Sequence, residues 1–119
     1  MQPPLASSRC DLRAHRRAVE GAGAVLQLTG SVPARLRFLA DQLCRAACSV
    51  PLNLAEGNGR CNRDRLHHWR IAYGSALEAG SALELLAAGG FVDARRARRV
   101  MAMLDEVRAM TFVLLHPRR

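Results

Sequence analysis

The sequence predicts an all-α fold, an antiparallel up-down bundle of four helices. Half of its 119 residues are apolar but only 4% are aromatic, so the core must be built from Leu, Val, Ala and Met. That composition suits packed helices better than a sheet sandwich. Apolar residues recur at steps of three and four along four segments, and short connections separate these segments. The length is that of one domain.

The first predicted helix covers Leu12–Leu28, and Asp11 can cap its start. Its apolar positions follow helical spacing at Leu12, His15, Val19, Ala22 and Leu26. Gly21 and Gly23 weaken this helix by roughly 1 kcal/mol each relative to alanine, unless a neighbouring helix crosses closely there.

The chain on either side of the bundle has a different composition. Residues 1–10 carry Pro and Ser without periodicity and are predicted to be a flexible tail. The bundle itself is predicted to span residues 11–116, and residues 117–119 to form a basic C-terminal tail.

A long second helix is predicted from Pro33 to the glycines at 57 and 59. One apolar stripe runs along it, comprising Leu36, Leu39, Leu43, Ala47, Val50 and Leu54. Pro51 interrupts this helix, removes one amide donor and crowds the carbonyl of Ala47. A kink is therefore expected there, with Ser49 or Asn53 satisfying the freed groups.

Asn62 is predicted to cap the third helix, which Gly89 and Gly90 terminate. Its stripe comprises Leu66, Trp69, Tyr73, Ala76, Leu77, Gly80, Leu83 and Ala87. Asp93 is predicted to cap the fourth helix, whose inward stripe comprises Val100, Leu104, Val107, Thr111 and Leu114. This helix also carries a second, offset apolar row formed by Met101, Phe112 and Leu115. A monomer would leave this row exposed to solvent, so the row predicts an oligomer interface.

Five polar residues interrupt the apolar pattern of the second and third helices: Arg45, Asn53, Glu56, Ser75 and Glu78. Paired carboxylates can perform general acid-base catalysis, so Glu56 and Glu78 are the only enzyme-like feature of the chain. The simpler interpretation is a structural polar network in which Arg45 neutralises one or both acids and fixes the helix register. The sequence favours this interpretation, and no enzymatic activity is predicted.

Arginine is the strongest functional signal. All 18 basic residues are arginine and the formal net charge is +8, which points to nucleic acid as partner ahead of an acidic protein or a membrane. Three clusters are predicted to contact nucleic acid: Arg13, Arg16 and Arg17; Arg60, Arg63, Arg65 and Arg70; and Arg95, Arg96, Arg98 and Arg99. Such contacts would be independent of base sequence and sensitive to salt. Each cluster taken alone could instead be an ordinary solvated helix face.

The cysteines Cys10, Cys44, Cys48 and Cys61 lack the spacing of a zinc site. A mixed metal site of Cys61 with His67 and His68 is the alternative. The favoured interpretation is that the cysteines act as small apolar side chains that fill the core. No metal or cofactor is predicted. No apolar run approaches the roughly 18 residues of a membrane span. Without a visible secretion signal, a cytoplasmic protein is expected.

The segment from Ser49 to Arg60, SVPLNLAEGNGR, and the later segment IAYGSALE ending at Glu78 carry a family resemblance. They resemble the core motif of small four-helix-bundle proteins that include those encoded in intervening sequences of large-subunit ribosomal RNA genes. The accessory variability protein of diversity-generating retroelements belongs to the same group. The matching positions are Arg45, Ser49, Pro51, Asn53, Ala55, Glu56, Gly57, Arg60, Gly74, Ser75 and Glu78.

The resemblance covers Asp11 to about Leu115, and it implies a basic, barrel-shaped homopentamer. The chain departs from the family pattern at two places, and both raise its positive charge. His15 lies near the position where family members carry an aromatic residue, and Ala34-Arg35 stands where their second helix has an acidic start. The retroelement relatives associate with a reverse transcriptase and with RNA, whereas the ribosomal intervening-sequence relatives have no established catalytic role.

The favoured hypothesis is therefore a non-catalytic oligomer that acts as an accessory subunit of a reverse transcriptase and scaffolds RNA, including an RNA/DNA template-primer. A stand-alone ribosomal-RNA-associated protein is the first alternative. A protein-interaction module that recruits a partner through the fourth helix is the second.

Overall fold

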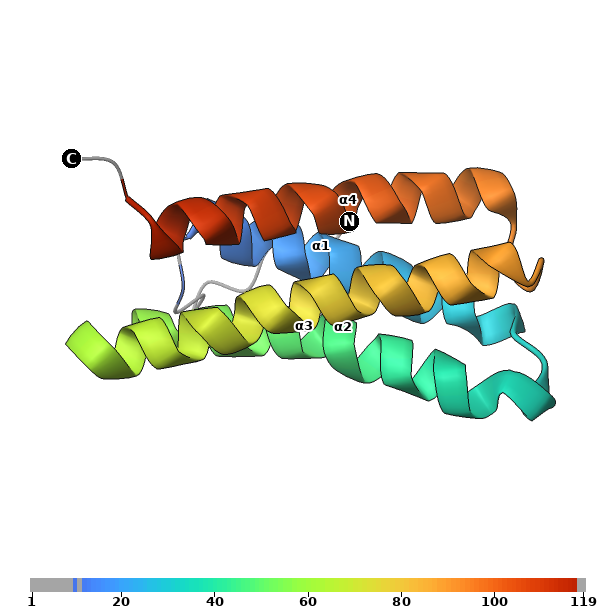
Figure 1. Ribbon diagram of the computed structural model, residues 1–119, viewed down its shortest axis with the longest axis horizontal. Coiled ribbons are helices and arrows are strands. Elements are labelled where there is room, and N and C mark those ends of the chain that lie inside the picture. Colours follow the sequence, from blue (N-terminus) through green and yellow to red (C-terminus); the bar gives the residue numbers. More distant parts are fainter. Residues whose placement is uncertain (1–9, 11, 118–119) are drawn as a thin grey trace, which may run out of the picture.

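A computed structural model describes residue 10 and residues 12–117, and within this part of the chain every regular element is helical (Figure 1). In chain order the elements are α1 (Arg13–Leu28), the 3₁₀ turns η1 (Thr29–Ser31) and η2 (Ala34–Leu36), α2 (Arg37–Asn58), α3 (Asn62–Ala88) and α4 (Ala94–Leu115). Consecutive helices run antiparallel, and α1 and α3 each pack against both α2 and α4. The prediction of an all-α four-helix bundle is confirmed.

The predicted tails lie mostly outside the described residues. Residues 1–9, Asp11 and residues 118–119 are not described, so the flexible tail and the capping role of Asp11 stay predictions. Cys10 is the exception, because it is buried with only 3% of its surface exposed. The packed part of the chain therefore extends one residue before the predicted start of the bundle.

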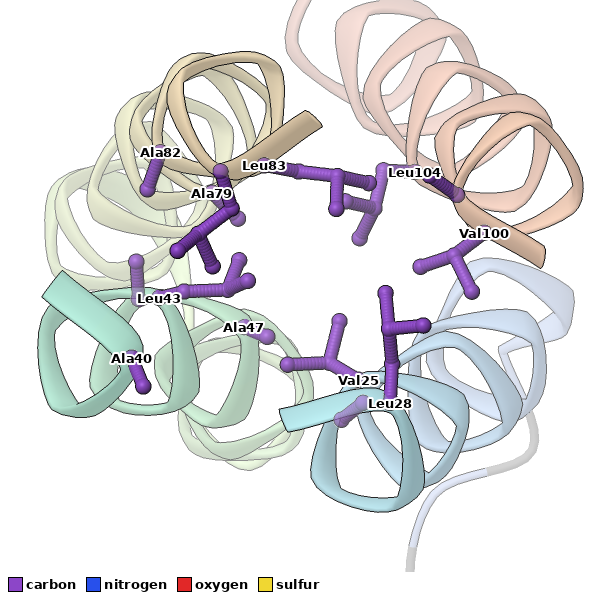
Figure 2. Close-up of a cluster of buried hydrophobic side chains, with 14 of the residues drawn as sticks. Val25, Leu28, Ala40, Leu43, Ala47, Ala79, Ala82, Leu83, Val100 and Leu104 are labelled. Carbon is purple, nitrogen blue, oxygen red and sulfur yellow. The ribbon is translucent and has the colours of Figure 1, made fainter. Parts of the chain in front are cut away.

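The core consists of two apolar clusters stacked along the bundle axis. One lies toward the α1–α2 and α3–α4 connections, and Figure 2 shows Val25, Leu43, Leu83 and Leu104 from the four helices pointing toward one another there. The other lies toward the α2–α3 connection and is built around Val50, Leu54, Trp69 and Val107, with alanines filling the remaining contacts. Both clusters consist mainly of Ala, Val and Leu, as the composition predicts.

The predicted face of α1 is partly wrong, because Ala22 is buried as predicted but two larger residues are not. Val19 and Leu26 are 50% and 52% exposed. The buried face instead comprises Ala14, Ala18, Gly21, Ala22, Val25 and Leu28. Small side chains let α1 approach its neighbours closely: a Cβ added at Gly21 would lie 3.7 Å from Cδ2 of Leu104. Of the two glycines, Gly21 thus lies against a neighbouring helix, whereas a Cβ added at Gly23 would meet nothing within 4 Å.

The predicted stripes of α2 and α4 are confirmed, with Leu43, Leu54, Leu104 and Val107 all buried. On α3 the stripe is partly wrong. Trp69, Ala76 and Leu83 are buried as predicted, but Leu77 and Ala87 are exposed. Ala72, Ala79 and Leu86 take the inward positions instead.

The helix ends follow the predicted signals in part. Asp93 caps α4, since its Oδ2 accepts a hydrogen bond of 2.9 Å from the backbone N–H of Arg96. Asn62 does not cap α3; it is the first residue of that helix and has a left-handed φ of 55°, which Asn tolerates better than most residues. Helix α2 continues through Pro51, and the side chain of Asn53 donates to the carbonyl of Ser49.

Candidate nucleic-acid interface

The bundle divides the predicted arginine clusters between its two ends. The start of α1, the α2–α3 connection and the end of α4 lie at one end, and the α1–α2 and α3–α4 connections lie at the other (Figure 1). The first two clusters therefore share one end, which we name the α2–α3 end. The third cluster occupies the opposite end, named the α3–α4 end. The 22 residues of α4 separate the two by about 33 Å.

Three arginines of the α2–α3 end are engaged within the chain. Arg17 donates to Glu20 at 2.7 Å and to Glu106 at 2.9 Å, and these hydrogen bonds raise the pKa of its guanidinium. Arg60 pairs with Glu56 at 3.0 Å, one helical turn away. These ion pairs reduce the positive charge available to a ligand.

Arg65 has a structural role. Its guanidinium donates to the carbonyls of Gly57 and Asn58 at 3.2 and 3.3 Å, which are carbonyls of the last turn of α2. The same guanidinium lies 5.4 Å from the ring centroid of Trp69. The structure therefore assigns it to closing the α2–α3 connection.

The other four predicted arginines at this end, Arg13, Arg16, Arg63 and Arg70, are exposed. Their side chains have no hydrogen-bond or ion-pair partner within residues 10 and 12–117. They are the members of the first two clusters that remain available to a phosphate.

The third predicted cluster lies at the α3–α4 end and forms no ion pairs within the described residues. Arg95, Arg96, Arg98 and Arg99 are all exposed, and no acid pairs with any of their side chains in the part of the chain described. The adjacent carboxylate, Asp93, is already the cap of α4. The start of this helix is thus a cationic segment with four free guanidinium groups.

Two further arginines lie at this end, and sequence analysis did not assign them to a cluster. Arg35 is exposed and its guanidinium lies 5.2 Å from the ring centroid of Phe91, which precedes α4. Arg37 is the exposed first residue of α2. The up-down topology brings residues 35–37 and 95–99 to the same end of the bundle. The predicted order of helices would therefore have been enough to group Arg35 and Arg37 with the third cluster.

The predicted polar network is only partly correct. Arg45, Glu56 and Glu78 are exposed, so the expectation that Arg45 neutralises these acids inside the bundle is wrong. Glu56 pairs with Arg60, and Glu78 accepts from Gln42 at 2.7 Å. Each of these residues is close in sequence to buried positions. Successive side chains on a helix point about 100° apart, so a shift of one residue is enough to turn a side chain from the core toward solvent.

Asn53 and Ser75 do form a network, with Ser49 and His68 as their partners. Ser75 Oγ and Asn53 Nδ2 both donate to Ser49 Oγ, at 2.9 and 3.0 Å. Asn53 Oδ1 lies 3.1 Å from His68 Nδ1, which must carry the proton because a carbonyl oxygen can only accept. This half-buried network joins α2 to α3, and Ser49 and His68 were absent from the predicted set.

The predicted oligomer row on α4 is unevenly exposed. Met101 packs against one core cluster and Leu115 against the other, so both contribute to the chain's own core. Phe112 is 47% exposed and lies beside the rings of Tyr73 and His116. Its neighbour Val113 is 60% exposed. The large exposed apolar side chains of α2 and α3 are Phe38, Leu52, Ile71, Leu77 and Leu85.

Cys44, Cys48 and Cys61 form no disulfide bond within the described residues. Cys44 and Cys48 are half-buried against the core, and burial together with the neighbouring Cys44 raises the pKa of the Cys48 thiol. Across the described residues, His, Cys, Asp and Glu form no group of three that could hold a metal ion. Within the same residues, no helix is both long enough and apolar enough to cross a membrane.

Comparison with known proteins supports the fold and shows the family. A crystal structure of a protein of unknown function from the S23 ribosomal protein family of Bacteroides thetaiotaomicron aligns with a TM-score of 0.79 and 18% identity. The alignment covers 87% of this chain and 98% of that chain. None of the curated proteins matches. The model of the 23S rRNA-intervening sequence protein family matches residues 10–112, so this chain belongs to that family.

Proposed function

We propose that this protein binds RNA as a non-catalytic homo-oligomer, through contacts of arginine with phosphate that do not depend on base sequence, and that ribosomal RNA is its partner in the cytoplasm. The observation that carries the proposal is the group of four exposed arginines at the start of α4, whose side chains pair with no acid among the described residues. An unneutralised cationic surface on a small domain attracts polyanions.

Arginine is well suited to this role. Its planar guanidinium presents several N–H groups that match two phosphate oxygens at once, and it remains charged at every physiological pH. The four residues at the start of α4 form one outward-facing arc, and Ala97 and Val100 are buried on the opposite side of the helix. Such an arrangement can contact neighbouring phosphates without reading bases.

The family match favours ribosomal RNA over a reverse transcriptase as the setting for this binding. Its description names 23S rRNA. The structural relative is described only as a protein of unknown function from the S23 ribosomal protein family. Neither description supports the accessory-subunit hypothesis, so the stand-alone alternative becomes the proposal.

Self-association would multiply the charge that each protomer offers. The formal charge of +8 per chain becomes a dense local field when several copies form a ring. Exposed apolar side chains on α2 and α3, Phe38, Leu52 and Leu77 among them, supply surface for such contacts. The pentamer implied by the family resemblance is the assembly that we propose.

The decisive test measures RNA affinity against salt concentration. Changing Arg95, Arg96, Arg98 and Arg99 together to Gln should weaken binding of a labelled single-stranded RNA. It should also flatten the log-log salt dependence by up to about 3, since each lost phosphate contact removes about 0.7. Unchanged affinity and slope in the quadruple variant would remove the start of α4 from the interface.

The matched control carries the same loss of charge at the opposite end, through Arg13, Arg16, Arg63 and Arg70 changed to Gln. These four arginines are spread over α1 and α3 and do not form one segment, so we expect a smaller change in slope. Crosslinking in cells identifies the RNA. Ribosomal RNA should be recovered in larger amounts with the unmodified protein than with the quadruple α4 variant. Enrichment of a retroelement transcript would instead favour the reverse-transcriptase hypothesis.

A further inference from the structure

A groove of about 240 Å³ lies between the second half of α1 and the first half of α4. Its lining residues are Ala24, Gln27, Arg96, Arg99, Val100 and Met103. The two helices approach closely at Gly21, where an added Cβ would lie 3.7 Å from Leu104 and 3.9 Å from Met103. Ala24, about one turn beyond Gly21, places only a methyl group beside α4, and the groove lies there.

The groove combines two cations with an apolar floor. Arg96 and Arg99 are three residues apart, so they lie on the same side of α4 and one above the other. The apolar part of the lining, named the floor, comprises Ala24, Val100 and Met103, and Gln27 adds a neutral amide to the lining. No acid lines the groove.

The acids Glu20, Asp93 and Glu106 of this helix pair already have partners. Glu106 lies three residues beyond Met103 and is paired with Arg17, which is also bonded to Glu20. Asp93 caps the helix. The two guanidinium groups of the groove therefore have no internal counter-ion among the described residues.

We propose that this groove binds one nucleotide of single-stranded RNA, with a phosphodiester between Arg96 and Arg99 and the ribose and base against Ala24, Val100 and Met103. This inference rests on the proposed RNA binding and names the site that holds the strand. Guanidinium groups contact phosphate oxygens in pairs, and they also stack on bases. The Gln27 amide can donate to and accept from a base edge or the 2′-hydroxyl.

The size and shape of the groove determine the ligand class. Its volume is a little below the roughly 300 Å³ that marks the lower end of small-molecule pockets, so it leaves no room for a ligand larger than a single nucleotide unit. A base can reach the apolar floor only when it is unstacked, and single strands provide such bases. Duplex RNA would contact the arginines through phosphates alone.

The first test compares two pairs of arginines on the same helix. Arg96→Gln with Arg99→Gln removes the groove cations, whereas Arg95→Gln with Arg98→Gln removes the same charge outside the groove. Binding of a short fluorescent oligouridine is measured by anisotropy at one salt concentration. The groove pair should lose at least about tenfold in affinity, as for lost charged hydrogen bonds, and the outer pair should lose much less.

The outcomes separate this inference from the proposed function. Equal losses in the two double variants would overturn the groove site while leaving charge-driven RNA binding in place. No binding of the oligouridine or of duplex RNA by the unmodified protein would overturn both.

A second test changes the groove without changing any charge. Ala24→Leu places a larger side chain on the floor, and Ala102→Leu makes the same change at an exposed position of α4 that does not line the groove. We expect Ala24→Leu to weaken oligouridine binding several-fold with an unchanged salt slope, and Ala102→Leu to bind normally. Melting temperatures confirm that both variants fold. Full affinity in a folded Ala24→Leu protein would overturn the site.

Discussion

The indole of Trp69 occupies the space that a side chain at Gly57 would need. A Cβ built at Gly57 would lie 2.5 Å from Cδ1 and 2.6 Å from Nε1 of Trp69, and 3.0 Å from the carbonyl oxygen of Arg65. The ring cannot move freely, because Nε1 donates a hydrogen bond of 3.3 Å to the carbonyl of Leu54 and the residue is buried. The end of α2 and the start of α3 are therefore packed through a glycine and a tryptophan.

Gly57→Ala is predicted to destabilise the fold by about 1 to 3 kcal/mol, the usual cost of overpacking a core. The added methyl group would push the indole from its position and strain the bond to Leu54. Urea denaturation measures the change in the free energy of unfolding.

The control is the same substitution at Gly23, where an added Cβ would meet nothing within 4 Å. Removing a glycine from an open position inside a helix should raise stability by up to about 1 kcal/mol. If both variants were stabilised equally, the indole of Trp69 would not prevent a side chain at position 57.

Ser49→Ala is predicted to cost about 1 to 2 kcal/mol, because Ser49 Oγ is the common acceptor for Ser75 Oγ and Asn53 Nδ2. Ser75→Ala should cost less, since only one hydrogen bond is lost. The double variant should be more stable than the sum of the two single effects predicts, because both variants remove the same bond. Strictly additive unfolding energies would show that the two hydroxyl groups do not interact.

The bundle was predictable from sequence because its signals are local. Leu43, Leu54, Leu104 and Val107 mark the inward faces of α2 and α4 with large apolar side chains at helical spacing. Asp93 caps α4 through its own backbone neighbours. Each of these features depends only on residues close in sequence.

The face of α1 and the polar network depend on contacts between helices, and the sequence could not resolve them. Alanine and glycine line the buried side of α1 with little hydrophobic contrast, while the larger Val19 and Leu26 point outward. Arg45 and Glu78 lie among apolar neighbours in the sequence but are exposed in the fold. The groove of Arg96 and Arg99 likewise required knowing that α1 packs beside α4.

His15 should make stability depend on pH. It is half-buried, its Nδ1 has no hydrogen-bond partner in the described chain, and burial lowers its pKa below the ordinary 6.5. As the pH falls below 6.5, the unfolded chain takes up this proton before the folded protein does, so stability declines until the pH passes the lowered pKa. Above 6.5 the residue is neutral in both states and makes no such contribution.

His15→Phe removes the titrating group and places an aromatic near where the family resemblance implies one. The decline in urea midpoint between pH 7 and mildly acidic pH should become smaller in this variant. His67→Gln is the control, because it removes an exposed imidazole. An equally steep decline in His15→Phe would mean that the acid sensitivity arises elsewhere.

Leu52→Asp is predicted to dissociate the proposed oligomer. Leu52 is 69% exposed on α2, and α2 and α3 together expose more large apolar side chains than α4 does. A second copy covering this surface would bury Leu52, and a buried, unpaired carboxylate would cost several kcal/mol. Phe112→Asp is the matched variant on α4, where Met101 and Leu115 already pack into the chain's own core. Light scattering should give the mass of one chain for Leu52→Asp and of the intact oligomer for Phe112→Asp. The reverse result would place the interface on the offset row of α4, and a monomeric unmodified protein would contradict self-association altogether.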